Sequence, residues 1–248
     1  MNISGILDLF NNLPAYTQAQ TRINDASDFL PLGLPKSARA PILARLFQDK
    51  NVPIILITGR VENVPIWQQE LHAWLNGSEG DTDILRFPEP TPLPYERGPW
   101  SDNSRQQRLT VLAKLMAGQH PLMPASDSPP LIVTSGRALL QRTLPKRNFT
   151  KATRILRVGQ IIDLNKLEES WEGVGYEKVN VVELPGQYSQ RGGILDIFPA
   201  GGTQFPMRIE LFGDEIDTLR RFDPATQRTI PDAEHPQRVL IPPAREAI

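Results

Sequence analysis

Apolar and polar residues follow two different spacings along this chain, and the spacing changes near residue 150. In the first part, apolar residues spaced for helices alternate with short apolar runs that are typical of strands. Helices are predicted over 37–50, 62–76, 101–117 and 137–142, and strands at 53–58, 84–87 and 131–134. The run at 53–58 is nearly continuous in apolar residues, which indicates a strand buried on both faces of a parallel sheet. Strands separated by helices predict an α/β domain with right-handed crossovers, and we expect an incomplete RecA- or helicase-like sheet.

From about residue 176 onward the apolar residues recur with a period of two. Met207, Ile209 and Leu211 alternate with charged residues, which predicts a half-buried strand. The turn 212–215 then leads into a second apolar strand at 216–222. A helix that Asp163 is expected to cap precedes these strands. The second domain is therefore predicted to be a smaller α+β domain, mainly antiparallel.

A basic and polar stretch over 146–154 marks the expected boundary between these two parts. We expect an α/β domain over 1–151 and an interaction domain over 152–238. Residues 239–248 are expected to begin a return to the first domain that is cut short.

Composition limits the chemistry that this chain can carry. Its 27 Lys and Arg nearly balance its 28 Asp and Glu, so net charge does not draw it to DNA or to anionic membranes. It has no cysteine, and its three histidines are scattered, so we expect no metal site. No apolar run approaches the roughly 20 residues of a membrane span, and the first residues do not form a signal peptide. These features predict a cytoplasmic protein without a membrane partner.

One segment has the spacing of a phosphate-binding loop but lacks most of its residues. Gly33 stands at the first glycine of G-x-x-x-x-G-K-[ST], whereas Ala38, Arg39 and Ala40 replace the second glycine, the lysine and the hydroxyl residue. The loop needs backbone N–H groups around the phosphates, a compact ammonium group and a hydroxyl for magnesium. The segment is either an ordinary loop before a helix or a degenerate nucleotide site. Both interpretations predict no ATP hydrolysis.

Several linked motifs in the second part carry a more specific signal. They are Leu156–Asp163, Gly175–Val179, Arg191–Pro199, Arg208–Asp217 and Phe222–Arg228. Their order and spacing resemble the UvrA-binding domain that UvrB shares with the transcription-repair coupling factors. The degenerate loop, and a short proline-rich connection around Leu93-Pro94-Tyr95 where UvrB has a long aromatic hairpin, make the chain more similar to the coupling factors.

The resemblance implies a module that docks UvrA and recruits nucleotide excision repair to RNA polymerase stalled at DNA damage. RNA polymerase and double-stranded DNA would bind to downstream domains that this segment lacks, and ATP and magnesium would serve motor domains that are also absent. No cofactor is expected in the segment itself. Arg191 and Lys178 match the basic residues of the family that contact UvrA, and Phe198 is a candidate aromatic anchor. Ser189 stands where UvrB commonly has a further arginine, so that contact is in doubt.

Two other classes of function remain open at this point. The chain could be a UvrB-like DNA helicase or damage-verification domain with a divergent ATP site, against which Ala38, Arg39 and Ala40 argue. It could also be a DNA-binding module, although its near-neutral charge argues against this. For single residues the simpler interpretations are a solvated Arg191 and a Phe198 that packs in the core.

Overall fold

The computed structural model describes residues 4–25, 31–75, 84–89, 100–116, 129–201, 205–231 and 235–246. The chain forms two compact units. The first unit contains residues 1–89 and 127–140, and the second contains 90–126 and 141–248. The proline-rich connection around Leu93-Pro94-Tyr95 lies outside the described residues.

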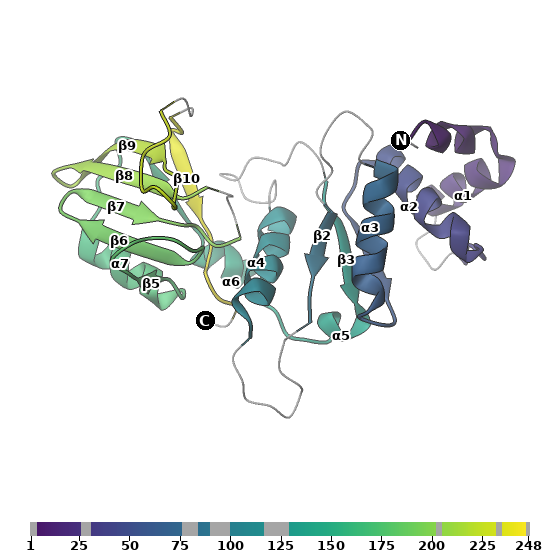
Figure 1. The fold of residues 1–248 in the computed structure, drawn as a ribbon, viewed down its shortest axis with the longest axis horizontal. Coiled ribbons are helices and arrows are strands. Elements are labelled where there is room, and N and C mark those ends of the chain that lie inside the picture. The colour runs from purple at the N-terminus through teal and green to yellow at the C-terminus, as the bar shows by residue number, and fades with distance from the viewer. Residues whose placement is uncertain are drawn as a thin grey trace. The chain divides into compact units, whose positions relative to one another are not determined.

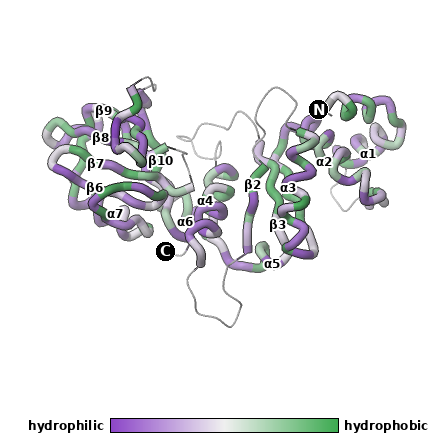
Figure 2. The backbone as a smooth tube through the Cα atoms, viewed as in Figure 1, coloured by the Kyte–Doolittle hydropathy of each residue, from purple (hydrophilic) through white to green (hydrophobic). Residues whose placement is uncertain are grey.

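The first unit is built on a parallel sheet of three strands (Figure 1). Its elements are η1 (Ser4–Asn12), α1 (Pro14–Asp25), α2 (Lys36–Lys50), β1 (Ile54–Thr58), α3 (Asn63–Leu75), β2 (Ile84–Phe87), β3 (Leu131–Ser135) and α5 (Gly136–Leu139). The strand order is β1-β3-β2, and both pairings are parallel. Buried residues of α2, α3 and the strands form one core, which includes Ala44, Leu71 and Val133. In Figure 2 the backbone of β3 carries the colour of hydrophobic residues.

The prediction that strand 53–58 is buried on both faces was wrong. The strand exists as β1, but it lies at the edge of the sheet, and Ile55 and Ile57 are 47% and 55% exposed. The buried strand is β3, whose five residues are all buried because it has a neighbour on each side. An apolar run therefore predicted the strand correctly but not its position in the sheet.

The second unit contains an antiparallel sheet with helices and a separate strand pair. Its elements are α4 (Asp102–Met116), α6 (Lys146–Ala152), β4 (Arg154–Arg157), α7 (Leu164–Gly173), β5 (Glu177–Lys178), β6 (Gln187–Arg191), β7 (Ile194–Ile197), β8 (Met207–Phe212), β9 (Glu215–Arg221) and β10 (Arg238–Ile241). The five-stranded order is β5-β6-β7-β8-β9, antiparallel except for β5 with β6. β10 pairs with β4. The side chain of Asp163 accepts a hydrogen bond from the Lys166 amide and so caps α7 as predicted.

One core joins α7, the inner face of this sheet and two earlier helices. Trp171 of α7 is fully buried and meets the ring of Tyr188 edge-on, with centroids 5.3 Å apart. Leu109 of α4 and Phe149 of α6 belong to the same buried cluster. The stretch expected to be a polar boundary is thus a helix that contributes to this core, and the expected boundary at 151–152 falls inside the second unit.

The segment that follows β10 also belongs to the second unit. Arg108 of α4 is fully buried, and its guanidinium donates to both carboxylate oxygens of Glu246 at 2.6 and 3.0 Å. The amide of Ala244 donates to the carbonyl of Val174 at 2.9 Å. The described part of 239–248, which we expected to return to the first domain, therefore packs within the second unit.

The predicted fold class is confirmed: a parallel α/β sheet is followed along the chain by a mainly antiparallel α+β region. Within the described ranges, no helix is both long and apolar enough to cross a membrane.

Candidate protein-docking site

The degenerate phosphate loop does not have the geometry of a nucleotide site. Gly33 has a left-handed φ of 59°, but the next helix already begins at Lys36, so Ala38, Arg39 and Ala40 lie inside α2. Pro35, at the position before the helix, has no N–H to offer a phosphate. The guanidinium of Arg39 donates to the carbonyl of Leu34 at 3.2 Å. The guanidinium of Arg39 therefore points back toward the loop.

The cavity beside this loop is lined mostly by hydrocarbon. It has a volume of about 400 Å³, and its walls include Leu34, Ile42, Leu46, Ile57 and Trp67. Triphosphate oxygens carry several charges that need N–H donors or cations, and the polar side chains in this lining are those of Arg39, Thr58 and Asn63. With Arg39 donating to Leu34, this lining offers a triphosphate few groups to bind it.

Arg191 lies at the end of a tight hairpin between β6 and β7. Arg191 pairs with Ile194 across the turn, and Gly192 has φ of 60°, which is the glycine-favouring conformation of a two-residue hairpin. A Cβ on Gly193 would come within 3.2 Å of the Leu211 carbonyl, so this turn also needs a residue without a side chain where it approaches β8. The glycines thus hold Arg191 beside the end of β8, with little neighbouring bulk.

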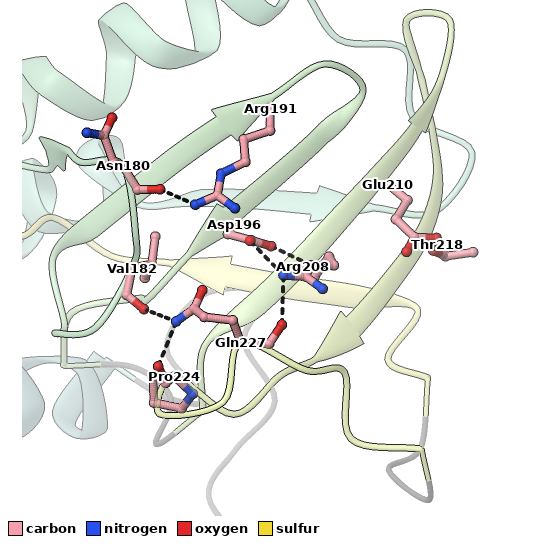
Figure 3. Close-up of polar contacts among 9 residues, drawn as sticks. All are labelled: Asn180, Val182, Arg191, Asp196, Arg208, Glu210, Thr218, Pro224 and Gln227. Atoms are coloured by element: carbon pink, nitrogen blue, oxygen red, sulfur yellow. Dashed lines mark hydrogen bonds and ion pairs between the residues drawn. The ribbon is translucent and has the colours of Figure 1, made fainter.

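The side chain of Arg191 is exposed and lies along the sheet face opposite the core. Its guanidinium donates to the carbonyl of Asn180, and Figure 3 shows it directed toward that carbonyl. A guanidinium has five N–H donors, so one backbone acceptor leaves others for a partner.

A buried ion pair supports the same face of the sheet (Figure 3). The carboxylate of Asp196 is only 4% exposed and accepts two hydrogen bonds of 2.8 Å from Arg208. The paired carboxylate raises the pKa of the Arg208 guanidinium further above its ordinary value. Arg208 also donates to the carbonyl of Gln227 at 3.3 Å, and the amide of Gln227 in turn donates to the carbonyl of Val182. These hydrogen bonds hold the loop that follows β9 against this face of the sheet.

Lys178 is engaged within the domain. Its ammonium lies 2.9 Å from a carboxylate oxygen of Glu168 on α7 and 5.9 Å from the ring centroid of Tyr188. Burial, a hydrogen bond to Glu172 and the charge of Glu168 raise the pKa of Tyr188 above its ordinary value. Lys178 therefore offsets a local excess of carboxylate. Its predicted contact with UvrA would compete with this pair.

Phe198 and Ser189 are less accessible than Arg191. Phe198 is half-buried, and its backbone is paired on both sides, by N–H to Gln187 and by C=O to Gly186. Ser189 is 3% exposed opposite Asp196, so its short side chain does not reach the surface where UvrB has an arginine. Of these three residues, Arg191 is the exposed one.

Sequence reasoning missed two exposed apolar side chains at the same end of the sheet. Phe212, the last residue of β8, is 83% exposed, and Ile161 is 76% exposed. Phe212 stands inside one of the motifs quoted above, but only its alternation with Leu211 hinted that it faces away from the core.

Comparison with known proteins gives two findings. Residues 155–246 match the family model described as the UvrB interaction domain. The chain is 32% identical over 244 residues to the transcription-repair-coupling factor of Bacillus subtilis (strain 168), which covers 92% of this chain and 19% of that protein. It is 33% identical over 218 residues to that of Myxococcus xanthus, covering 87% of this chain and 17% of that protein.

A third relative, the transcription-repair-coupling factor of Mycobacterium bovis, is 33% identical over 234 residues and covers 94% of this chain. The chain thus spans about a fifth of the length of these relatives. It is similar over most of its length to one segment of the transcription-repair-coupling factors, and its residues 155–246 match the UvrB interaction domain.

Proposed function

We propose that this chain docks UvrA through the outer face of its five-stranded sheet, the face that carries Arg191. The docking would recruit nucleotide excision repair to RNA polymerase stalled at DNA damage. The exposed Arg191 on its glycine hairpin carries this proposal, within a region that matches the UvrB interaction domain. Permanent charge and a planar fork of donors suit arginine for pairing with a carboxylate of a partner.

The proposal also covers the other activities of a complete coupling factor. ATP-dependent translocation on double-stranded DNA and the contact with RNA polymerase would reside in regions that the relatives have and that lie outside these 248 residues. The alternative of a helicase with a divergent ATP site is not favoured, because most side chains that line the cavity beside the loop are apolar and Arg39 donates back to Leu34.

The direct test is a calorimetric titration of purified UvrA into the chain. We expect saturable binding that weakens as salt is raised, because part of the interface is ionic. Absence of binding at concentrations of tens of micromolar, with the chain folded by circular dichroism, would contradict the proposal.

A further inference from the structure

We propose that Phe212, Ile161 and Ile194 form the apolar centre of the surface that docks UvrA, beside Arg191. We call these three residues the apolar strip. The inference rests on the docking function proposed above and names the part of the surface that supplies its hydrophobic contact.

Strand register places the strip on the same face as Arg191. Arg191 pairs with Ile194, and Ile194 pairs with Glu210 of β8. Residues directly opposite each other in an antiparallel pair share a face. Met207 and Ile209 of β8 are buried in the core, so Glu210 and Phe212 face the other way. A hydrogen bond of 2.8 Å from the Leu211 amide to the Gly193 carbonyl brings the end of β8 against the Arg191 hairpin.

Ile161 extends this row on the far side of β9. It forms a bridge with Glu215, which in turn pairs with Phe212. Two flanking hydrogen bonds fix this position: the Ile162 amide donates to the Asp214 carbonyl at 2.8 Å, and the Ile216 amide donates to the Gln160 carbonyl at 2.9 Å. The row Ile161–Glu215–Phe212 therefore continues the face toward the hairpin of Arg191.

The exposure of these side chains is unusual for their size. Phe212 and Ile161 are 83% and 76% exposed, and Ile194 is 39% exposed. Single exposed apolar residues are normal on a protein surface, whereas several on one face beside an exposed arginine favour an interaction site. A central aromatic residue with a neighbouring arginine is the residue set that most often dominates binding energy.

The chemistry of the strip specifies what its partner must offer. Phe212 and Ile161 need an apolar recess, and Arg191 needs a carboxylate at its edge. Glu215 lies between the two apolar side chains in the row and remains exposed, so the partner also needs a donor or water there. Phe212 therefore takes the role of aromatic anchor that the sequence had suggested for Phe198.

The experiment is a titration of UvrA with the complete chain carrying Phe212→Ala, Ile161→Ala or Arg191→Ala, each at low and at moderate salt. Leu140→Ala is the matched control, because Leu140 is 85% exposed and belongs to the first unit. We expect Phe212→Ala to weaken binding roughly tenfold or more and Ile161→Ala by less. These factors should not change with salt, whereas the factor for Arg191→Ala should shrink as salt rises. Leu140→Ala should bind as the wild type does.

The outcomes separate the two proposals. If the wild type binds UvrA and Arg191→Ala weakens it, but Phe212→Ala and Ile161→Ala bind normally, the apolar strip is overturned while the docking function stands. If the wild type does not bind, both are overturned. Equal losses for Phe212→Ala and Leu140→Ala would also overturn the strip, since any exposed apolar residue would then act alike. Melting curves should match among the variants because the substituted side chains are exposed.

Discussion

The guanidinium of Arg208 donates two hydrogen bonds of 2.8 Å to the carboxylate of Asp196, whose side chain is only 5% exposed. This pair connects the middle of β7 to β8 on the face that also carries Arg191 and Ile194, two residues along β7 from Ile194. A buried pair of this kind contributes to specificity of structure more than to net stability, but removing one partner is costly.

Asp196→Asn should lower the free energy of unfolding of the second unit by about 3 kcal/mol, because the buried charge of Arg208 loses its counter-ion. Chemical denaturation would measure the loss. Arg220→Ala is the control: Arg220 and Glu210 lie 3.8 Å apart with side chains 38% and 32% exposed, so this change should cost less than about 1 kcal/mol. Equal costs for the two variants would show that Asp196 is not the buried anchor described here.

Leu109→Ala should destabilise the antiparallel sheet although Leu109 lies on α4, far from that sheet in the sequence. Leu109 is fully buried in the core that includes Trp171, and a buried Leu→Ala change costs about 2–5 kcal/mol. Hydrogen exchange should accelerate in β6–β8 and stay unchanged in β1–β3. Leu71→Ala, in the core of the first unit, should give the reverse pattern. Acceleration confined to β1–β3 in Leu109→Ala would place α4 in the wrong unit.

The chain should neither bind ATP at millimolar concentration nor hydrolyse it. The reason is the arrangement at the degenerate loop: Pro35 lacks an N–H, Arg39 donates to Leu34, and most side chains that line the adjoining cavity are apolar. Isothermal titration with magnesium and ATP is the appropriate measurement. Saturable binding that requires magnesium would contradict this prediction and revive the helicase alternative.

Lys178→Ala should weaken UvrA binding by a smaller factor than Arg191→Ala, because Lys178 already has Glu168 as its partner. The same change should lower the melting temperature, since Glu168, with a side chain only 14% exposed, is left without a cation. Glu168→Gln releases Lys178 and should leave UvrA binding equal or slightly tighter. A loss of UvrA binding in Glu168→Gln would mean that the Lys178–Glu168 pair itself forms part of the interface.

Periodicity predicted most elements of this fold because local side-chain spacing determines them. The helices at 36–50 and 63–75 and the strand pair 207–212 and 215–221 lie within a few residues of their predicted positions. The position of a strand in the sheet depends on which segments pair with it. The apolar run of β1 does not indicate that β1 pairs with β3 on one side only. Helix α6 was missed because it is short and basic, and only Phe149 and Ala152 mark its buried side.

The candidate site was predictable only as far as a motif could indicate it. Arg191 was identified from its place before two glycines in a linked set of motifs, and the hairpin confirms its position at a turn. The pairing of Lys178 with Glu168 could not be predicted, because it joins a strand to a helix through tertiary packing. The exposure of Phe212 could not be predicted either, because a phenylalanine at the end of a strand is more often buried.

One titration series decides whether Arg191 holds UvrA on the outer face of the sheet. Calorimetry with UvrA should compare the wild type with Arg191→Ala and with Arg147→Ala, an exposed arginine on α6 that serves as the charge-matched control. If Arg191 pairs with a carboxylate that becomes buried, its loss costs about 2–5 kcal/mol of binding, and Arg147→Ala costs nothing beyond error. Wild-type affinity in Arg191→Ala, with an unchanged melting curve, would contradict the account.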